Sequence, residues 1–363
     1  MTNTFETGGS ERQFTVLAQN LRPASFQVHL GCIRRMGPFA EQFGDVPEFR
    51  LGGSLFGWGS LRTRLRLRSH LRRHQIRIAH AFDFYTNLTL IPAAKLAGVP
   101  VVIGSQRQIG DLLTPAQFRA QAAAFRWADA IICNSQAAAE GLAEAGVDRA
   151  KLVVIGNALP AEVFAAVAPA VAKKDGILRV GMVARMNARY KNHSGFLRIA
   201  ARIRRELPSV EFLLAGDGPL RSEIENEARS LGLGNSVIFL GDRRDIAAVH
   251  ASMDVAVLTS DSESLSNVIL EAMAAGLPVV AFEGGGNPEL INAERGALAP
   301  PGDEAAFSSH VLRLLTQPVL REQLGRNARQ FVEEYFGLER VRDRYQQVYR
   351  TLLQKKGAGP SLA

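Results

Sequence analysis

Cysteine is scarce in this 363-residue chain, which contains only Cys32 and Cys133. Each lies in an apolar run, HLGCI or AIICNS. Two isolated cysteines in such runs form neither a disulfide framework nor a metal cluster, so we expect two buried thiols.

Long hydrophobic runs are also absent. No stretch reaches the roughly 18 apolar residues that a membrane-spanning helix needs. The start, MTNTFETGGSERQFT, lacks the basic beginning and apolar centre of a secretory signal. We therefore expect a cytoplasmic chain. Its length exceeds what one hydrophobic core usually supports, so two domains are predicted.

Positive charge is present in excess, with a net charge of +8, and it is unevenly placed. Residues 60–77, SLRTRLRLRSHLRRHQIR, hold seven arginines and no acid. This stretch is able to lie on the inner face of an anionic membrane. Alternatively, it is a solvated helix whose Leu61, Leu65 and Leu71 pack inward. A nucleic-acid partner is not expected, because aromatic residues do not interleave with the arginines.

Short β-branched runs alternate with helical patterns, which is typical of parallel sheets covered by helices. The predicted strands of the first half are 26–33, 77–82, 100–105, 130–135 and 151–157. A second series begins at 178–185 and continues with EFLLAGDG, SVIFLG, DVAVLTS and PVVAFEGG. The fold class is therefore α/β, with two Rossmann-like domains at 1–160 and 177–335. Residues 160–176 are the predicted linker. After Pro301 the pattern is helical, and a last helix at 338–356 is expected to pack back towards the first domain.

The stretch ESLSNVILEAMAAG, residues 263–276, contains two glutamates in different settings. Glu263 follows a strand in a polar loop, whereas Glu271 lies in an apolar helix that Gly276 ends. Ligands of parallel sheets bind beyond the carboxyl ends of the strands, where helix amino termini attract anions. A carboxylate beside a phosphate site is unexpected unless it accepts hydrogen bonds from hydroxyl groups. Sugars and riboses offer such hydroxyls in pairs. The pattern predicts one glutamate for each sugar ring of a nucleotide sugar.

Five landmarks occur in order with this pair: ARMNARYKNH, AGDGPLRSEIE, FLGDRRDIAAVHASMD, ESLSNVILE and GGNPELI. Together they resemble the donor-binding domain of the retaining GT-B glycosyltransferases of family 4, over Val180 to Ile291. The first half contains four weaker matches to motifs of the family: TGGSERQ, IAHAFD, CNSQA and VVIGNALP. The resemblance implies two domains that face each other across a cleft.

The resemblance also implies roles for individual residues. Arg185 and Lys191 match the family's cations, which stabilise the departing nucleotide diphosphate in place of a metal ion. Glu263 matches the position that contacts the transferred sugar and orients it, and Glu271 the position that accepts the ribose hydroxyls. Backbone N–H groups at Ser266 and Asn267 face the distal phosphate. The other residues implied on the donor side are Leu265, Gly216, Gly218, Arg243 and Gly285.

The sequence departs from the family pattern in three places, of which the first two concern side chains. Six positions rather than five separate Arg185 from Lys191, and the intervening Arg189 is a further candidate for the phosphate. The histidine that many relatives carry after a middle strand of the first domain is replaced in GSQRQIGD by Gln106 or Arg107. We expect those two residues, with Gly8 and Gly9, on the acceptor side.

The third departure concerns the first strand. TGGSERQFTVLAQNL resembles the glycine loop and helix that follow strand one, yet only MTNTFE precedes it. The first strand of the N-terminal domain is therefore predicted to be missing. Since a gap in a parallel sheet leaves backbone groups unpaired, we expect the chain to be less stable than one extended upstream.

The resemblance implies a metal-independent, retaining hexosyltransferase that uses a nucleotide-diphosphate sugar such as a UDP-sugar. The expected acceptor is a glycan, lipid-linked if the basic stretch meets a membrane, in polysaccharide or glycoconjugate synthesis. No cofactor is expected, because the nucleotide sugar is a substrate. The alternatives are a noncatalytic sugar-nucleotide-binding subunit and a GT-B epimerase.

Overall fold

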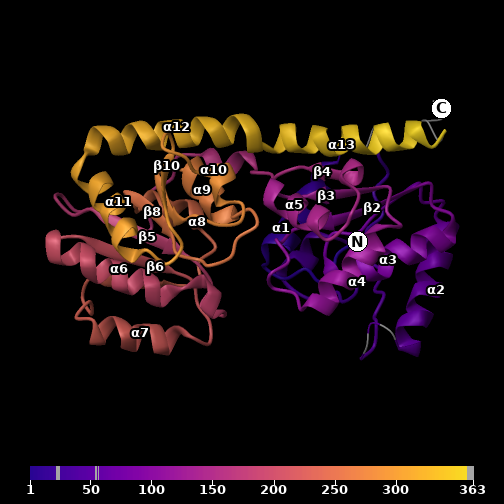
Figure 1. The fold of residues 1–363 in the computed structure, drawn as a ribbon, viewed down its shortest axis with the longest axis horizontal. Helices are drawn as coiled ribbons and strands as arrows, with labels where there is room; N and C mark the ends of the chain where they lie inside the picture. The colour runs from indigo at the N-terminus through magenta and orange to yellow at the C-terminus, as the bar shows by residue number, and fades with distance from the viewer. Residues whose placement is uncertain (22–24, 54, 56, 358–363) are drawn as a thin grey trace. The chain divides into compact units, whose positions relative to one another are not determined.

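The computed structural model describes residues 1–21, 25–53, 55 and 57–357. The chain forms two compact units, each with its own sheet (Figure 1). The first unit contains Met1–Ala158 and the segment from Leu338 onwards, and the second contains Leu159–Gly337. Within the described residues, no helix combines the length and the apolar character needed to cross a membrane.

The second unit has a six-stranded parallel sheet with the order β10-β9-β8-β5-β6-β7. Apolar residues on both faces of the strands are buried, because helices cover both sides. The strands are β5 (Arg179–Val183), β6 (Glu211–Ala215), β7 (Val237–Gly241), β8 (Val255–Leu258), β9 (Val279–Phe282) and β10 (Gly296–Ala299). The helices are α6 (His193–Glu206), α7 (Arg221–Ser230), α8 (Ile246–Ala251), α9 (Asn267–Ala274), α10 (Asn287–Leu290), α11 (Glu304–Thr316) and α12 (Pro318–Phe336). The edge strand β10 is short and was not among the predicted strands.

The first unit has a four-stranded parallel sheet with the order β1-β2-β3-β4. The strands are β1 (Ile78–His80), β2 (Val101–Gln106), β3 (Ala130–Cys133) and β4 (Leu152–Val154). The helices are α1 (Gly9–Asn20), α2 (Trp58–Arg73), α3 (Phe84–Ala97), α4 (Pro115–Phe125) and α5 (Gln136–Glu144). Asp83 and Thr86 begin α3 with a reciprocal capping box.

The last helix, α13 (Leu338–Lys355), belongs to the first unit. Its Tyr345 and Tyr349 are buried in a core that also contains Phe14 and Phe82. The Tyr349 hydroxyl lies 2.7 Å from Nδ1 of His80. Helix α13 is therefore part of the core of that unit, although more than 170 residues separate it from β4.

The prediction of a strand at residues 26–33 is wrong. Only Cys32 makes a parallel bridge, to Thr2 on one side and to Glu48 on the other. In the part of the chain that the structure describes, Met1 and Thr2 lie between Cys32 and the end of β1, where Met1 bonds to His80 and Phe82 and Thr2 bridges Cys32. A strand forms only where a partner supplies a ladder, and residues 26–31 have no partner there among the described residues.

Candidate functional site

The loops that carry the predicted donor site lie at one edge of the second unit's sheet. From β5 the chain adds β6 and β7 on one side, and then crosses to add β8, β9 and β10 on the other. The strand order therefore reverses between β5 and β8, which is where open α/β sheets bind their ligands. The loop Arg185–Asn192 follows β5, and the loop Thr259–Ser266 follows β8.

Hydrogen bonds join these two loops. The Asp261 N–H donates to Tyr190 O at 2.8 Å, and the Thr259 hydroxyl donates to Asn192 O at 2.8 Å. Asn192 adopts a left-handed conformation (φ 53°), and its side chain accepts from Gly195 N–H at the start of α6. Prediction from motifs overlooked Asn192, Tyr190 and Thr259 as positioning residues. An asparagine before a helix is a capping signal that would have found the first of them.

Lys191 and Glu263, from opposite sides of the switch point, form an ion pair. Lys191 Nζ donates to Glu263 Oε1 at 2.7 Å, and the two side chains are only 21% and 12% exposed. The Lys191 ammonium also lies 5.0 Å from the ring centre of Tyr190. A half-buried pair of this kind holds a cation and a carboxylate ready for a ligand with both an anionic and a hydroxyl group.

The other two arginines of this loop point to different surroundings. Arg185 is exposed, directly after Ala184 at the end of β5. Arg189 instead makes a bidentate contact with Glu223 of α7, at 2.7 and 3.0 Å. That contact raises the pKa of the Arg189 guanidinium, and it turns the side chain towards α7.

Helix α9 places the second glutamate. Ser266 is the N-cap, and its side chain accepts from Ile269 N–H. Asn267 is the first residue of the helix, and Leu265 is buried against the core. Glu271 lies one turn further along and is 8% exposed, among buried apolar neighbours on the same helix. The N–H groups of the first turn of α9 lie at the positive end of the helix dipole, which attracts an anion.

The glycines of AGDGP allow two backbones to come into contact. Gly216 (φ 138°) and Gly218 (φ 153°) adopt conformations that favour glycine. A Cβ on Gly216 would lie 2.0 Å from Ala184 O, and one on Gly218 would lie 2.5 Å from Met186 O. Both glycines therefore pack the loop after β6 directly against the loop that begins with Arg185.

Gly285 and Arg243 differ in their surroundings. Gly285 (φ 51°) lies in the loop after β9, and the next N–H, that of Gly286, donates to Glu263 O at 3.0 Å. This bond ties the glycine loop to the Glu263 loop. Arg243 makes a bidentate ion pair with Asp245 at the surface.

The residues predicted for the acceptor side lie in the first unit. Gly8 is the N-cap of α1, and Gly9 is its first residue. Gln106 is buried, donates to Gln108 O at 2.7 Å and accepts from Gln121. The Arg107 guanidinium donates to Asn157 and lies 5.0 Å from the ring centre of Phe82. Both side chains thus form hydrogen bonds with other residues of the first unit.

Metal binding has no obvious location in the part of the chain that the structure describes. No group of three or more His, Cys, Asp or Glu side chains is placed there to hold an ion. Cys32 and Cys133 are both buried, and burial raises their pKa to about 11 and about 12.

The fold and the candidate site together indicate the class of protein to which this chain belongs. Two Rossmann-like units with parallel sheets, and loops gathered at a switch point, are the architecture of GT-B glycosyltransferases. The structure of Anabaena Alr3699/HepE in complex with UDP has a TM-score of 0.84 and 21% identity, covering 96% of this chain and 98% of that one.

The family follows from the sequence comparisons. Residues 7–163 match the family model described as Glycosyltransferase Family 4, and residues 177–317 match the one described as Glycosyl transferases group 1. The chain belongs to this family of GT-B glycosyltransferases.

Two curated relatives illustrate the range of the family. The lipopolysaccharide core biosynthesis glycosyltransferase LpsE of Rhizobium meliloti is 31% identical over 62% of this chain and 65% of its own length. The Escherichia coli UDP-Gal:α-D-GlcNAc-diphosphoundecaprenol α-1,3-galactosyltransferase is 26% identical over 91% of this chain and 90% of its own. The chain spans only 26–65% of the length of five curated relatives, LpsE among them.

Proposed function

We propose that this protein transfers a hexose from a nucleotide-diphosphate sugar to a glycan acceptor, in polysaccharide or glycoconjugate synthesis. The observation that carries the proposal is the pairing of Lys191 with Glu263 across the switch point, beside the start of α9. The names of LpsE and of the E. coli galactosyltransferase, and the UDP bound to HepE, support the same chemistry.

Each residue then has a defined task. Negative charge develops on the diphosphate as the glycosidic bond breaks, and Lys191, exposed Arg185 and the N–H groups at the start of α9 stabilise it. Glu271 accepts hydrogen bonds from the ribose. Glu263 holds Lys191 in place before the donor binds, and it accepts from hydroxyls of the transferred sugar.

We further propose that the reaction retains the anomeric configuration and needs no metal ion. The two cations of the β5 loop supply the charge that a bound metal would otherwise supply. By analogy with the family, retention would follow from departure and attack on the same face of the sugar. Proton NMR of the first product formed reports the configuration, and activity that persists in EDTA reports metal independence.

The test of the site compares three cations of one loop. We expect Lys191→Ala and Arg185→Ala to lower the rate of transfer or of UDP-sugar hydrolysis by about 10²–10³-fold, because each removes charge stabilisation of the leaving group. Arg189→Ala is the matched control, since its guanidinium binds Glu223, and it should keep a rate within about threefold of the wild type.

Two outcomes would count against the proposed roles, and a further variant tests Glu271. Equal losses for Arg185, Lys191 and Arg189 would contradict the assigned roles. UDP binding by calorimetry without turnover of any UDP-sugar would favour the noncatalytic subunit. Glu271→Gln should weaken UDP binding, because the neutral amide is a weaker acceptor for the ribose hydroxyls.

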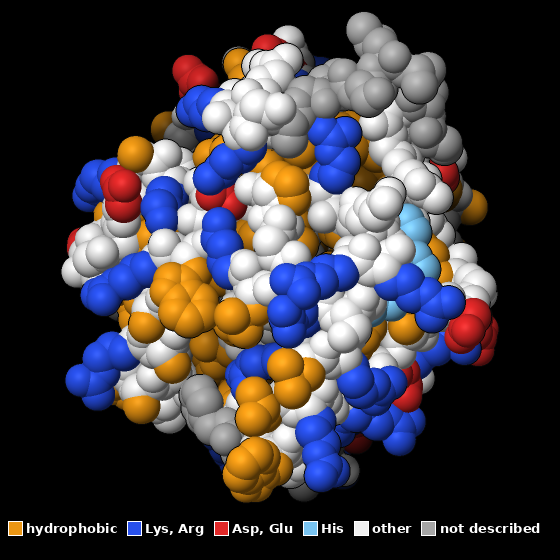
Figure 2. Space-filling view, turned by 90° about the vertical axis from the view of Figure 1, so that its right-hand side faces the viewer, with side chains coloured by type: hydrophobic (Ala, Val, Ile, Leu, Met, Phe, Trp, Pro, Cys, Tyr) orange, Lys and Arg blue, Asp and Glu red, His pale blue; other side chains and the backbone are white. Residues whose placement is uncertain are grey.

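We also propose that α2 brings the first unit to an anionic membrane surface, where a lipid-linked acceptor would be found. Trp58, Leu61 and Leu65 share one face of the helix and are 81%, 46% and 48% exposed. Of the leucines that a solvated helix would turn inward, only Leu71 is buried. Figure 2 looks onto the side that carries α2, where Lys and Arg side chains surround hydrophobic ones.

The arginines of α2 divide into two groups. Arg64, Arg68 and Arg72 donate to backbone carbonyls of α3, at Leu88, Leu96 and Ala97, and so fix α2 to the unit. Arg62, Arg66 and Arg73 are exposed beside the apolar stripe. This combination of an apolar stripe and outward cations is typical of helices that lie in a membrane interface.

A further inference from the structure

Three buried amide side chains surround the end of β2 in the first unit. Asn87 of α3, Gln106 of β2 and Gln121 of α4 are 0%, 1% and 1% exposed. Burying an amide is costly unless its donors and acceptor find partners. When they do, a buried polar network rigidifies the backbone to which it is bonded. The end of β2 belongs to the edge at which parallel sheets bind their ligands.

Hydrogen bonds join these amides into a chain that runs in one direction. The Asn87 amide donates to Gln121 Oε1 at 3.2 Å, and the Gln121 amide donates to Gln106 Oε1. The Gln106 amide then donates to Gln108 O at 2.7 Å, in the loop that follows β2. Among the described residues, no buried polar atom of the three side chains lacks a partner. Because each amide accepts from one neighbour and donates to the next, the loss of one changes the whole chain.

The other end of this amide chain is fixed to the backbone of β2. Ser105 N–H donates to Asn87 Oδ1 at 3.2 Å, and the Asn87 amide donates to Ser105 O at 2.8 Å. Strand β1 pairs with β2 only as far as His80 and Ile103. Asn87 therefore supplies Ser105 with the backbone partners that β1 does not supply. The amide chain thus connects Ser105 with Gln108 across the point where β2 ends.

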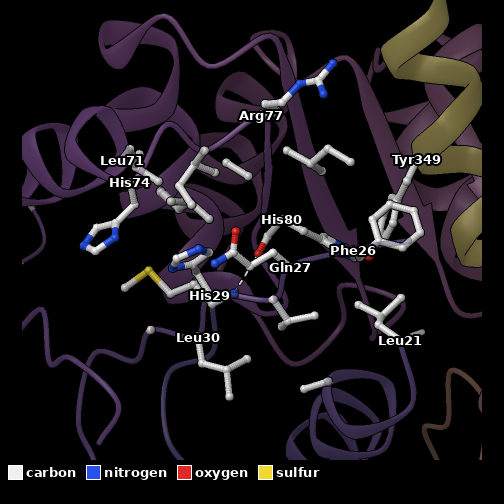
Figure 3. A pocket seen from close by; sticks show the side chains of 18 of the residues that line it. Leu21, Phe26, Gln27, His29, Leu30, Leu71, His74, Arg77, His80 and Tyr349 are labelled. Carbon is white, nitrogen blue, oxygen red and sulfur yellow. Dashed lines mark hydrogen bonds between the residues drawn. The ribbon is translucent and has the colours of Figure 1, made fainter. Parts of the chain in front are cut away.

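Ser105 is held from a second side by His80 of β1. His80 Nε2 lies 2.8 Å from the Ser105 hydroxyl, and His80 Nδ1 lies 2.7 Å from the Tyr349 hydroxyl. Figure 3 shows Tyr349 extending from α13 towards His80. The base of the loop is therefore anchored by side chains of several neighbouring elements before the chain leaves the sheet.

The loop that these contacts hold contains residues 107–113. Gly110 (φ 104°) packs against Phe118 of α4, and a Cβ at this position would lie 2.6 Å from the ring. The N–H groups of Gln108, Ile109 and Gly110 donate to no other described residue, and these three residues are half-buried. Consecutive backbone donors in such a position suit the oxygen atoms of a sugar.

We propose that Asn87 and Gln121 are positioning residues of the acceptor site. Through Gln106 they hold the loop 107–113 in the conformation in which its backbone N–H groups bind hydroxyls of the acceptor glycan. This role rests on the proposed transfer reaction. It assigns the contact with the acceptor to the loop backbone, whereas the side chains of Gln106 and Arg107 bond within the unit and position the loop.

The test replaces single glutamines of the full chain with methionine, which is similar in length but has no N–H donor. Gln121→Met breaks the amide chain in its middle, and Gln106→Met removes the donor to Gln108 O. Gln346→Met is the matched control, because Gln346 is a 2% exposed residue of the same unit that lies outside the amide chain.

Three measurements are made on each protein. UDP-glucose, UDP-galactose and UDP-N-acetylglucosamine are screened with octyl glycosides of the same three sugars, and the pair that the wild type converts fastest serves as donor and acceptor. Steady-state transfer gives kcat and the KM of the acceptor. Hydrolysis of the same UDP-sugar without acceptor reports the donor site. The rate of trypsin cleavage at the Arg107–Gln108 bond reports how firmly the loop is held.

Gln121→Met and Gln106→Met should each raise the KM of the acceptor by at least about tenfold, while kcat and UDP-sugar hydrolysis stay within about threefold of the wild type. Trypsin should cleave the Arg107–Gln108 bond at least about tenfold faster in both variants, because the released loop opens more often. Gln346→Met should change none of these quantities. Gln106→Met alone gives the answer if Gln121→Met does not fold.

An acceptor KM within about twofold of the wild type in the glutamine-chain variants would overturn the proposal, even if trypsin cleaved the loop faster. An equal rise of KM in Gln346→Met would also overturn it, because any buried substitution in the unit would then have the same effect. Failure of the proposed function looks different. The wild-type protein itself would neither hydrolyse nor transfer from any of the three UDP-sugars, and the acceptor role would fall with it.

Discussion

Single side chains set the chemistry of the donor site through their partners. Lys191 and Arg189 are two residues apart in sequence, yet one faces Glu263 at the switch point and the other faces Glu223 at the surface. Their roles are therefore expected to differ, although both are cations of the same loop. The same distinction separates exposed Arg185 from Arg243, which is held by Asp245.

His250 of α8 is a single residue whose burial is expected to make stability depend on pH. It is 1% exposed, and neither ring nitrogen has a hydrogen-bond partner among the described residues. Burial lowers its pKa to about 4 from the usual 6.5. Between these values the unfolded chain binds one more proton than the folded chain, so stability is complete above pH 6.5 and is lost as the pH falls through 4.

We expect His250 to contribute up to about 3 kcal/mol to the fall in unfolding free energy between pH 7 and pH 4. Urea unfolding at several pH values measures this slope. His250→Leu should flatten it, while His310→Gln, a more exposed histidine of the same unit, should leave it largely unchanged. If the His250→Leu protein kept the wild-type slope, the buried neutral histidine would not be its cause.

Backbone contacts between loops fix the positions of the candidate site residues. Gly216 and Gly218 let the loop after β6 contact the Arg185 loop, and Gly286 ties the loop after β9 to Glu263. Loops that follow four neighbouring strands are thus joined at one edge of the sheet. The position of each catalytic candidate depends on backbone contacts between elements as much as on its own loop.

Helix α2 gives a prediction at this level. Replacing Arg62, Arg66 and Arg73 with glutamine should weaken binding to vesicles of phosphatidylcholine with about 30% phosphatidylglycerol by roughly 1 kcal/mol per arginine. Serine at Trp58, Leu61 and Leu65 should weaken binding further. Vesicle flotation at low salt measures both effects, which should shrink as salt is added.

The matched control changes two exposed arginines of α6, Arg202 and Arg205, to glutamine. This removes a similar charge from the other unit and should leave flotation unchanged. Equal losses from the α2 and α6 variants would mean that net charge, and not the α2 face, attracts the vesicles.

The molecule as a whole consists of two units with separate cores but different chain paths. The second unit is continuous, and its first and last residues, Leu159 and Gly337, pair with each other. The first unit is discontinuous, because Val341, Tyr345 and Tyr349 of α13 complete its core.

This difference predicts unequal fragments. Residues 159–337 alone should unfold cooperatively and bind UDP, since both the sheet and the proposed donor site are complete in them. Residues 1–158 alone should not fold until residues 338–357 are supplied, because three large buried side chains would otherwise be missing. Circular dichroism and calorimetry distinguish the two, and a disordered 159–337 fragment would contradict the prediction.

Much of the fold could be read from local pattern. Buried parallel strands are continuous apolar runs, so the sequence predicts nine of the ten strands that the described residues form, near their observed positions. The cap and the stop of α9 are likewise visible in SLSN and Gly276. The sequence also indicated the glutamate pair and the Arg–Lys loop as candidate site residues. Charged residues next to apolar strands and helices are costly to bury unless they have a partner.

The structural features that the sequence alone could not predict depend on contacts between residues that are distant in the chain. Residues 26–33 have strand-like composition, but a strand needs a ladder, and among the described residues of this segment Cys32 alone makes bridges, to Thr2 and Glu48. Arg189 and Gln106 became committed to Glu223 and Gln121 only when the chain folded. Local periodicity specifies which elements form and which face is apolar, whereas hydrogen bonds and burial are set by whatever tertiary packing brings alongside.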